Sequence, residues 1–411
     1  MYDSLILLGD KKTKNNNIFS IFSSGYITHR DCWVYNFNKK LLEKNVKYLI
    51  DNYNNDVSRL QSMGVVDDIA PFITTDETKI KWNKSLLDDA QKRIIHKYNS
   101  HALELSIYRP YCKQFFYNDS PLYWSHYMMP KLFPTKDAHN LIICLPGPGN
   151  TKGFDCLISN VIVDYSVMST GLCFPLYWYE ENKNRQLSLF DEQTDDKYIR
   201  RDGITDWILK EVRSRYGTKN ITKEMIFYYV YGLLHSEDYR QRFAADLKKS
   251  LPRIPIVERV EDFMDFNQYG KKLADLHLNY ETVAPYPGVV VKGDRKATEA
   301  ESDYDYFRVY DKMRFKSKDD KSTIIYNGSI SIENIPEKAY QYLVNGKSAI
   351  EWIVERYCVS RDKKSLIMND ANDWSKEHKK PRYILDLLLS VINVSVQTVD
   401  IINALPKLKF D

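Results

Sequence analysis

The middle of the chain reads YYVYGLLHS over residues 228–236 and continues as DYRQRF over residues 238–243. Thr222 precedes this stretch and has a side chain typical of a helix N-cap, with an acidic residue two positions later in the first turn. The sequence LPRIP at 251–255 follows, where proline ends a helix. The pattern predicts one long helix from Thr222 to Lys249.

On both sides of this helix, apolar residues recur at three- and four-residue steps, which is typical of amphipathic helices. Short apolar runs bounded by Pro, Gly, Asn and Asp predict strands, and Asn327-Gly328 predicts a hairpin turn. The helices are expected over residues 40–63, 84–98, 204–215, 257–278, 337–343, 348–359 and 383–404. The strands are expected over residues 103–108, 114–117, 141–145, 161–163, 174–179, 308–315, 322–326 and 329–332.

These elements predict an α+β fold with mixed sheets flanked by helices in two lobes. The boundary is expected after the prolines at 251–255, which gives an N-terminal lobe over residues 1–255 and a C-terminal lobe over 256–411. The polar stretch 180–203 is expected to be a long surface loop.

The composition of the 411 residues is that of an ordinary globular protein, with 43% hydrophobic residues. Because 59 Lys and Arg nearly balance 55 Asp and Glu, the net charge of +4 permits contact with nucleic acid without requiring it. The 31 tyrosines are compatible with a binding surface, although tyrosine also packs in cores. The composition therefore leaves the function open.

The six cysteines show no short paired spacing of the kind that zinc or redox sites use. We expect most of them to be buried thiols in a reducing compartment. The sequence offers no signal peptide and no run of about 20 apolar residues, so we expect a cytoplasmic protein without a membrane segment.

The central stretch and four further segments resemble one protein family. The further segments are THRDCWVYNF at 28–37, YRPYCKQFFY at 108–117, CFPLYWY at 173–179 and NDANDW at 369–374. Together they resemble the C-terminal target recognition module of type ISP restriction-modification enzymes, which are single-chain DNA methyltransferase-translocase-nucleases. The chain departs from the family pattern at His29, where Gly is frequent, and at Tyr111, where Phe is usual.

The resemblance implies that the chain recognises a short double-stranded DNA sequence for a methyltransferase and a helicase-nuclease outside it, in cis or in trans. An Asn-Pro-Pro-Tyr loop and a phosphate loop are both missing from the sequence, so we expect no catalytic residue, metal site or cofactor in this chain. S-adenosylmethionine, ATP and Mg²⁺ are expected to serve the missing catalytic domains.

Candidate DNA-binding residues are basic or amide side chains placed among aromatic rings. Arg109, Lys113 and Gln114 have this setting, since Arg and Gln can contact base edges and Lys can contact phosphate. Arg30 and Arg240 are further candidates. The alternative reading is that these side chains pack or pair inside the protein. Base-reading residues are also expected in the variable loops 293–314 and 361–382, because family members read different sequences.

A glycine-rich loop, LPGPGNTKG over residues 145–153, suggests phosphate binding. Its Lys152 is followed by Gly153, whereas a phosphate loop requires Ser or Thr there. Lys152 is therefore a candidate contact to a DNA phosphate. The rival functions are an independent enzyme that binds a nucleotide or phosphorylated substrate at Gly147–Gly153, and a scaffold that binds protein.

Overall fold

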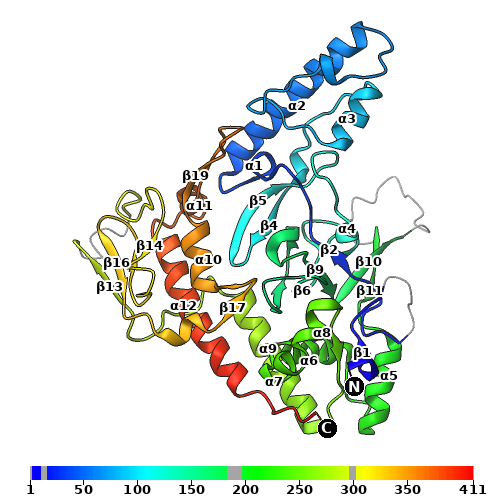
Figure 1. The fold of residues 1–411 in the computed structure, drawn as a ribbon, viewed down its shortest axis with the longest axis vertical. Coiled ribbons are helices and arrows are strands. Elements are labelled where there is room, and N and C mark those ends of the chain that lie inside the picture. Colours follow the sequence, from blue (N-terminus) through cyan, green and yellow to red (C-terminus); the bar gives the residue numbers. More distant parts are fainter. Residues whose placement is uncertain (1, 11–15, 183–196, 296–301, 411) are drawn as a thin grey trace, which may run out of the picture.

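The computed structural model describes residues 2–10, 16–182, 197–295 and 302–410. The molecule is elongated (Figure 1). A helical arm of α2 (Lys39–Ser62) and α3 (Lys84–Gln91) forms one end, and both termini and α5 (Asp206–Tyr216) lie toward the other. Small sheets with helices around them lie between these ends. The fold is α+β, as the sequence predicts.

Two four-stranded sheets occupy the centre of the molecule. The first has the order β3 (Tyr35–Asn36), β5 (Cys112–Tyr117), β4 (Leu103–Arg109) and β8 (Ile162–Val163). The second has the order β2 (Ser23–Ser24), β9 (Leu172–Pro175), β6 (Ile142–Leu145) and β7 (Leu157–Ser159). All neighbours are antiparallel except β4 and β8. The strands predicted at 103–108, 114–117, 141–145 and 161–163 are thus confirmed to within two residues.

The prediction of a loop over residues 180–203 is wrong at both ends, where the chain forms strands. Tyr177–Glu181 (β10) and Tyr198–Asp202 (β11) pair as an antiparallel ribbon, and residues 183–196 lie outside the described part of the chain. The strand expected over 174–179 is divided between β9 and β10. Leu176 separates them because its N–H bonds to the Leu141 carbonyl and its carbonyl accepts the N–H of Gly203.

The α2 helix confirms the prediction for residues 40–63. It begins after the N-cap Asn38, whose side chain accepts the N–H of Leu41 at 2.9 Å. One stripe of α2 is buried, including Leu42, Val46 and Leu49. Its opposite side faces outward and carries charged residues.

The helix predicted over 84–98 is shorter, because α3 ends at Gln91. Arg93 has a left-handed φ of 60°, which stops the helix. The following residues are held along α2, where the Asn54 side chain donates to the His96 carbonyl at 2.8 Å and accepts the His96 N–H at 3.0 Å.

The single helix predicted over 222–249 is three helices: α6 (Lys223–His235), α7 (Glu237–Arg242) and α8 (Ala244–Lys249). The predicted N-cap is confirmed, since the Thr222 hydroxyl accepts the N–H of Met225 at 3.2 Å. The break occurs at Ser236, which is extended and accepts the N–H of Tyr239 with its side chain. Ser236 therefore ends α6 and caps α7.

The α6 helix packs closely against α9 (Val260–Leu278). A Cβ atom on Gly270 would lie 1.9 Å from the Tyr228 carbonyl oxygen, and one on Gly232 would lie 2.3 Å from the Phe266 carbonyl oxygen. Glycine at both positions lets the two backbones touch. The YYVYGLLHS stretch is therefore held in the fold by the contact between α6 and α9.

A third sheet has the order β13 (Val290–Gly293), β16 (Ile330–Glu333), β15 (Ile324–Ile325) and β14 (Arg314–Phe315). The hairpin predicted at Asn327-Gly328 is confirmed, and the Asn327 side chain accepts the N–H groups of Ser329 and Ile330. The strand predicted over 308–315 is reduced to two residues. Val309 instead bonds through its N–H and carbonyl to the Asn372 side chain.

Two-stranded sheets complete the fold. They pair β1 (Ile6–Leu7) with β12 (Arg253–Ile254), β17 (Leu343–Val344) with β18 (Lys347–Ser348), and β19 (Val359–Arg361) with β20 (Met368–Asp370). The remaining helices are α1 (Asp31–Val34), α4 (Met129–Leu132), α10 (Ala349–Arg356), α11 (Asn372–Glu377) and α12 (Tyr383–Asn403), and the segment predicted at 337–343 is a single 3-10 turn over Glu337–Tyr340.

The two hydrophobic cores do not follow the expected lobe boundary. One core holds residues between Tyr26 and Cys173 together with residues between Leu276 and Val399. The other is centred on α6 and α9 and also includes Leu405. Each core therefore draws on both sides of residue 255, and the division into lobes 1–255 and 256–411 stays a prediction.

The α12 helix is long and apolar enough on average to cross a membrane, although Asp386, Asn393 and Asp400 interrupt its apolar residues. Its most apolar window is 72% buried within the protein, and residues such as Ile384, Leu388 and Val391 belong to the larger core. α12 therefore packs as a core helix.

Candidate nucleic-acid interface

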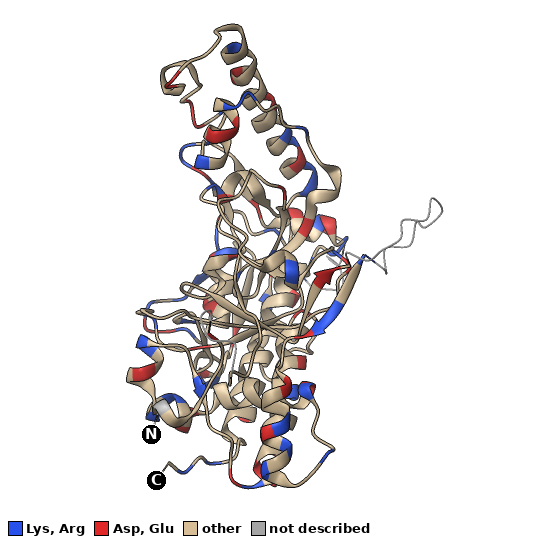
Figure 2. Ribbon diagram, turned by 90° about the vertical axis from the view of Figure 1, so that its right-hand side faces the viewer, with Lys and Arg blue, Asp and Glu red and all other residues tan. Residues whose placement is uncertain are grey.

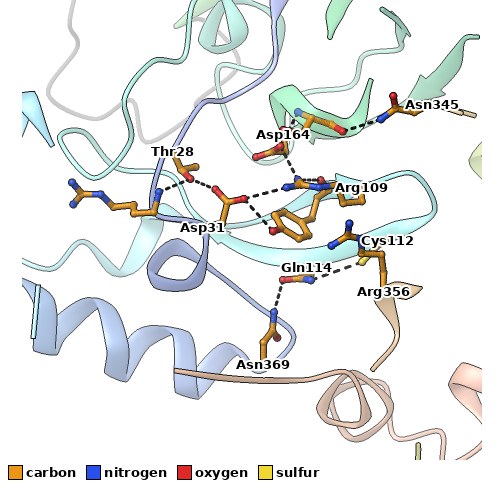
Figure 3. Close-up of polar contacts among 12 residues, drawn as sticks. Thr28, Asp31, Arg109, Cys112, Gln114, Asp164, Asn345, Arg356 and Asn369 are labelled. Atoms are coloured by element: carbon orange, nitrogen blue, oxygen red, sulfur yellow. Dashed lines mark hydrogen bonds and ion pairs between the residues drawn. The ribbon is translucent and has the colours of Figure 1, made fainter. Parts of the chain in front are cut away.

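Arg109 ends β4 and lies between two carboxylates (Figure 3). Its Nη1 is 2.8 Å from Asp164 Oδ1, and its Nη2 is 3.2 Å from Asp31 Oδ2. The guanidinium also stacks on Tyr108, 3.9 Å from the ring centre, and the Tyr108 hydroxyl donates to Asp31 at 3.0 Å. Only 14% of the Arg109 side chain is exposed. Both its charge and its flat face are therefore used inside the protein.

Asp164 connects this network to the adjacent strand. It is buried, its Oδ1 accepts the N–H of Ser166 at 2.8 Å, and its own N–H bonds to the Ile107 carbonyl of β4. Burial raises the pKa of Asp164 to about 7, opposed by the Arg109 guanidinium and reinforced by the Asp31 carboxylate. The ion pair therefore holds β4 to the segment that follows β8.

Arg30 lies next to this network but does not join it. Its N–H donates to the Thr28 hydroxyl at 3.2 Å, and that hydroxyl donates to Asp31. The residue is 1% exposed, and its guanidinium nitrogens have no hydrogen-bond partner within the described chain. Burial lowers the pKa of Arg30 to about 9. A contact between Arg30 and DNA would require a conformation different from this one.

Lys113 and Gln114 on β5 both have partners from the C-terminal half. The Lys113 ammonium is 2.7 Å from Glu281, which also accepts the Tyr383 hydroxyl. Gln114 is 2% exposed, and its Oε1 accepts the Asn369 amide at 3.1 Å. These contacts attach the central sheet to segments that are more than 150 residues away in the sequence.

Arg240 contacts the segment that follows the glycine-rich loop, at Phe154, Asp155 and Cys156. Its Nε donates to the Leu234 carbonyl at 2.7 Å, and its Nη1 is 3.8 Å from Asp155. The side chain is 22% exposed. In Arg240, as in Arg109 and Lys113, the charge is directed toward a partner inside the molecule.

Several N–H groups of the glycine-rich loop are already used inside the protein. Those of Gly147, Gly149 and Lys152 donate to Ser169, Lys248 and the Asn150 side chain, at 3.1, 2.8 and 2.9 Å. A phosphate-binding loop needs such groups free and a helix after the loop, whereas extended chain and β7 follow here. The geometry therefore does not favour the nucleotide-binding alternative. No group of three potential metal ligands occurs in the part of the chain that the structure describes.

Lys152 is the predicted contact residue that faces outward. Its side chain is exposed and lies against the turn at Gly346, 3.2 Å from the position of a Cβ on that glycine. No carboxylate lies within 4 Å of its ammonium among the described residues. Lys152 can therefore reach a ligand without breaking an internal pair.

Charges of both signs are spread over the molecule (Figure 2), so a basic surface has to be found locally. One forms where the first turns of α2 meet the end of α11. We call it the α2–α11 lysine surface; its members are exposed lysines, namely Lys39, Lys40, Lys44, Lys379 and Lys380. This surface could not be found from the sequence alone because its two halves lie far apart in the chain, although the four-residue spacing of Lys40 and Lys44 is a local signal.

Only one of the two variable loops expected to read bases lies wholly within the described residues. The segment 293–314 includes residues 296–301, which lie outside the described part of the chain. The segment 361–382 holds β20, α11 and the two lysines at 379 and 380. The second segment thus contributes directly to the α2–α11 lysine surface.

Comparisons with known proteins agree with this fold. The family described as "Type ISP C-terminal specificity domain" matches residues 17–387. A search of the curated proteins gave no match. Solved structures similar to the chain include a nuclease-deletion mutant of the type ISP restriction-modification enzyme LlaGI in complex with a DNA substrate mimic, at 37% identity and a TM-score of 0.84.

Two further solved structures are similar. One is the ATP-dependent type ISP restriction-modification enzyme LlaBIII bound to DNA, at 35% identity and a TM-score of 0.84, and the other is the DrdV–DNA complex, at 27% and 0.79. The three alignments cover 100%, 100% and 99% of this chain but only 35%, 24% and 38% of the other chains. The chain thus spans about a quarter to two fifths of those proteins. It belongs to the family of type ISP C-terminal specificity domains.

Proposed function

We propose that this chain binds double-stranded DNA and recognises a short asymmetric sequence in it. The observation that carries the proposal is the match over essentially the whole chain to type ISP enzymes solved with DNA, at 35–37% identity for LlaGI and LlaBIII. The chain matches the specificity part of these proteins, so its own contribution is recognition, in the cytoplasm where the DNA lies.

Catalysis in this proposal belongs to parts outside the chain. An adenine-N6 methyltransferase, using S-adenosylmethionine, rotates the target adenine out of the stack while this chain holds the duplex. A helicase-nuclease, using ATP and Mg²⁺, acts on sites that remain unmodified. Both reside in cis or in trans, and the bound chain presents the site to them.

The internal contacts suggest different roles for the predicted residues. Arg109, Lys113, Gln114 and Arg240 hold strands and loops in place through partners of their own. Lys152 is exposed and unpaired among the described residues, and it contacts a phosphate in this proposal. Phosphate contacts supply affinity, while base-edge contacts discriminate by about 1–3 kcal/mol per base pair.

The proposal is tested by fluorescence anisotropy with the purified chain and labelled duplexes. The salt concentration is varied between about 50 and 200 mM, because phosphate contacts weaken strongly over this range. We expect binding that weakens with salt along a straight line in a double-logarithmic plot, because each phosphate contact releases counterions. Lys152→Gln should weaken binding about eightfold at 0.1 M salt if it removes one such contact. Absence of binding by the unmodified chain at the lowest salt would contradict the proposal.

A further inference from the structure

The α2–α11 lysine surface is assembled from two segments that lie more than 330 residues apart in the sequence. The Asn38 amide donates to Asp373 at 3.1 Å, and the Lys39 N–H donates to Glu377 at 3.3 Å. These bonds join the first turn of α2 to α11. Figure 1 shows the base of the α2 arm above α11 and β19. The lysines that follow α11 are therefore brought beside those of α2.

The charges on this surface are only partly neutralised. Among the described residues, no carboxylate lies within 4 Å of the ammonium group of any lysine in this surface. Nearby pairs do exist, since Lys47 contacts Glu43, and Lys376 contacts Asp373. Glu43 and Asp373 are thus paired with other lysines, and Glu377 accepts the backbone N–H of Lys39. The five lysines of the surface outnumber these three acids, so the surface is net positive.

The helix gives these lysines a fixed spacing. α2 rises about 1.5 Å per residue, so Lys40 and Lys44 lie about 6 Å apart along its axis. Phosphates follow one another about every 3.4 Å along the axis on each DNA strand, so the two lysines match phosphates about two steps apart. The buried stripe on the other side of α2 holds the helix against the body.

The chemistry of the side chains indicates what they can recognise. Lysine is a compact point charge on a flexible stem, which suits phosphate oxygens, whereas Arg, Asn and Gln make the two-pronged contacts that distinguish bases. The surface is defined by its five exposed lysines, and none of them has a carboxylate partner among the described residues. A surface of this kind supplies affinity that is independent of sequence.

We propose that the α2–α11 lysine surface binds the sugar-phosphate backbone of double-stranded DNA without reading its bases. This rests on the proposed function and deepens it by separating the gripping surface from the residues that confer specificity. The surface orients the duplex and adds to affinity for every sequence equally. Base discrimination is carried by other parts of the chain.

The experiment compares two double variants with a matched control. Lys40→Gln/Lys44→Gln and Lys379→Gln/Lys380→Gln each remove two charges from the surface. Lys210→Gln/Lys219→Gln removes two exposed lysines at α5 and just beyond it, toward the opposite end of the molecule (Figure 1). Lys40, Lys44 and Lys210 are helical, where glutamine has nearly the propensity of lysine, and the other three lysines are exposed outside helices. All three variants should therefore melt like the unmodified chain.

Each variant is titrated with a preferred duplex, obtained by selection, and with a duplex of unrelated sequence, across a range of salt. Each test pair should reduce the magnitude of the salt slope by about 2, and should weaken binding of both duplexes about 60-fold at 0.1 M salt, if each lysine neutralises one phosphate. The ratio of the two affinities should stay unchanged. The control pair should leave the slope and both affinities as they are.

The outcomes separate this proposal from the function it rests on. Test variants with the slope and affinity of the unmodified chain would overturn the lysine surface while DNA binding itself stands. Loss of affinity for the preferred duplex alone would also overturn it, because that result would show base reading. An unmodified chain that binds neither duplex would overturn the proposed function and this inference with it.

Discussion

Replacing Arg109 by methionine should destabilise the protein far more than it changes DNA contacts. The variant leaves Asp164, which is 4% exposed, without the guanidinium that lies 2.8 Å away. At an effective dielectric constant of about 20, the attraction lost at this distance is about 6 kcal/mol before solvation is counted. Since removing Arg109 also removes the cost of burying it, we expect a net loss of about 3–5 kcal/mol in the free energy of unfolding.

The loss should depend on pH in a defined direction. Burial already raises the pKa of Asp164 to about 7, and without Arg109 the pKa rises further, so the folded variant keeps a proton that the unfolded chain has released. Keeping this proton becomes more costly as pH rises. The stability gap between the variant and the unmodified chain should therefore be wider at pH 8.5 than at pH 6.5.

Urea unfolding followed by circular dichroism measures both effects. The matched control is Arg109→Met with Asp164→Asn, which removes both charges and should recover most of the stability. DNA affinity is measured under folding conditions at the same time. An Arg109→Met chain that unfolds within about 1 kcal/mol of the unmodified protein but binds DNA weakly would refute the structural role and favour a direct DNA contact.

Three further results are expected. Gly270→Ala should lower the melting temperature, at a cost of about 3 kcal/mol or more, because its Cβ would lie 1.9 Å from the Tyr228 carbonyl oxygen. Gly328→Ala, which meets no atom within 4 Å, should melt like the unmodified chain, and equal losses for both would refute the close helix crossing. Burial lowers the pKa of His277 to about 3, below the unfolded value near 6.5, so the unfolded chain is protonated first as pH falls. The free energy of unfolding should therefore fall below pH 6.5, by about 2 kcal/mol at pH 5. The urea midpoint of His277→Gln should fall less than that of the unmodified chain between pH 6.5 and pH 5.

The helices with strong apolar periodicity were predictable from sequence because their burial pattern is local. α2 and α12 lie within one residue of their expected ends. Thr222 was predictable as a cap for the same reason. The break at Ser236 was not, since serine inside an apolar run can either continue a helix or cap the next one, and the choice depends on how α7 packs.

The candidate site was harder to predict because it depends on partners far away in the sequence. Arg109 meets Asp164 and Gln114 meets Asn369, and no local pattern specifies either pair. The same limit applies to the α2–α11 lysine surface, whose halves come together through Asn38 and Asp373. The family resemblance, in contrast, was carried by short sequence segments and is confirmed by the family match over residues 17–387.

Selection of bound duplexes from a random pool at moderate salt tests the central claim most directly. The purified chain is incubated with the pool, bound DNA is recovered and sequenced, and the cycle is repeated. The account predicts that one short asymmetric motif becomes enriched. Recovery of all sequences alike, or of none even in dilute buffer, would contradict it.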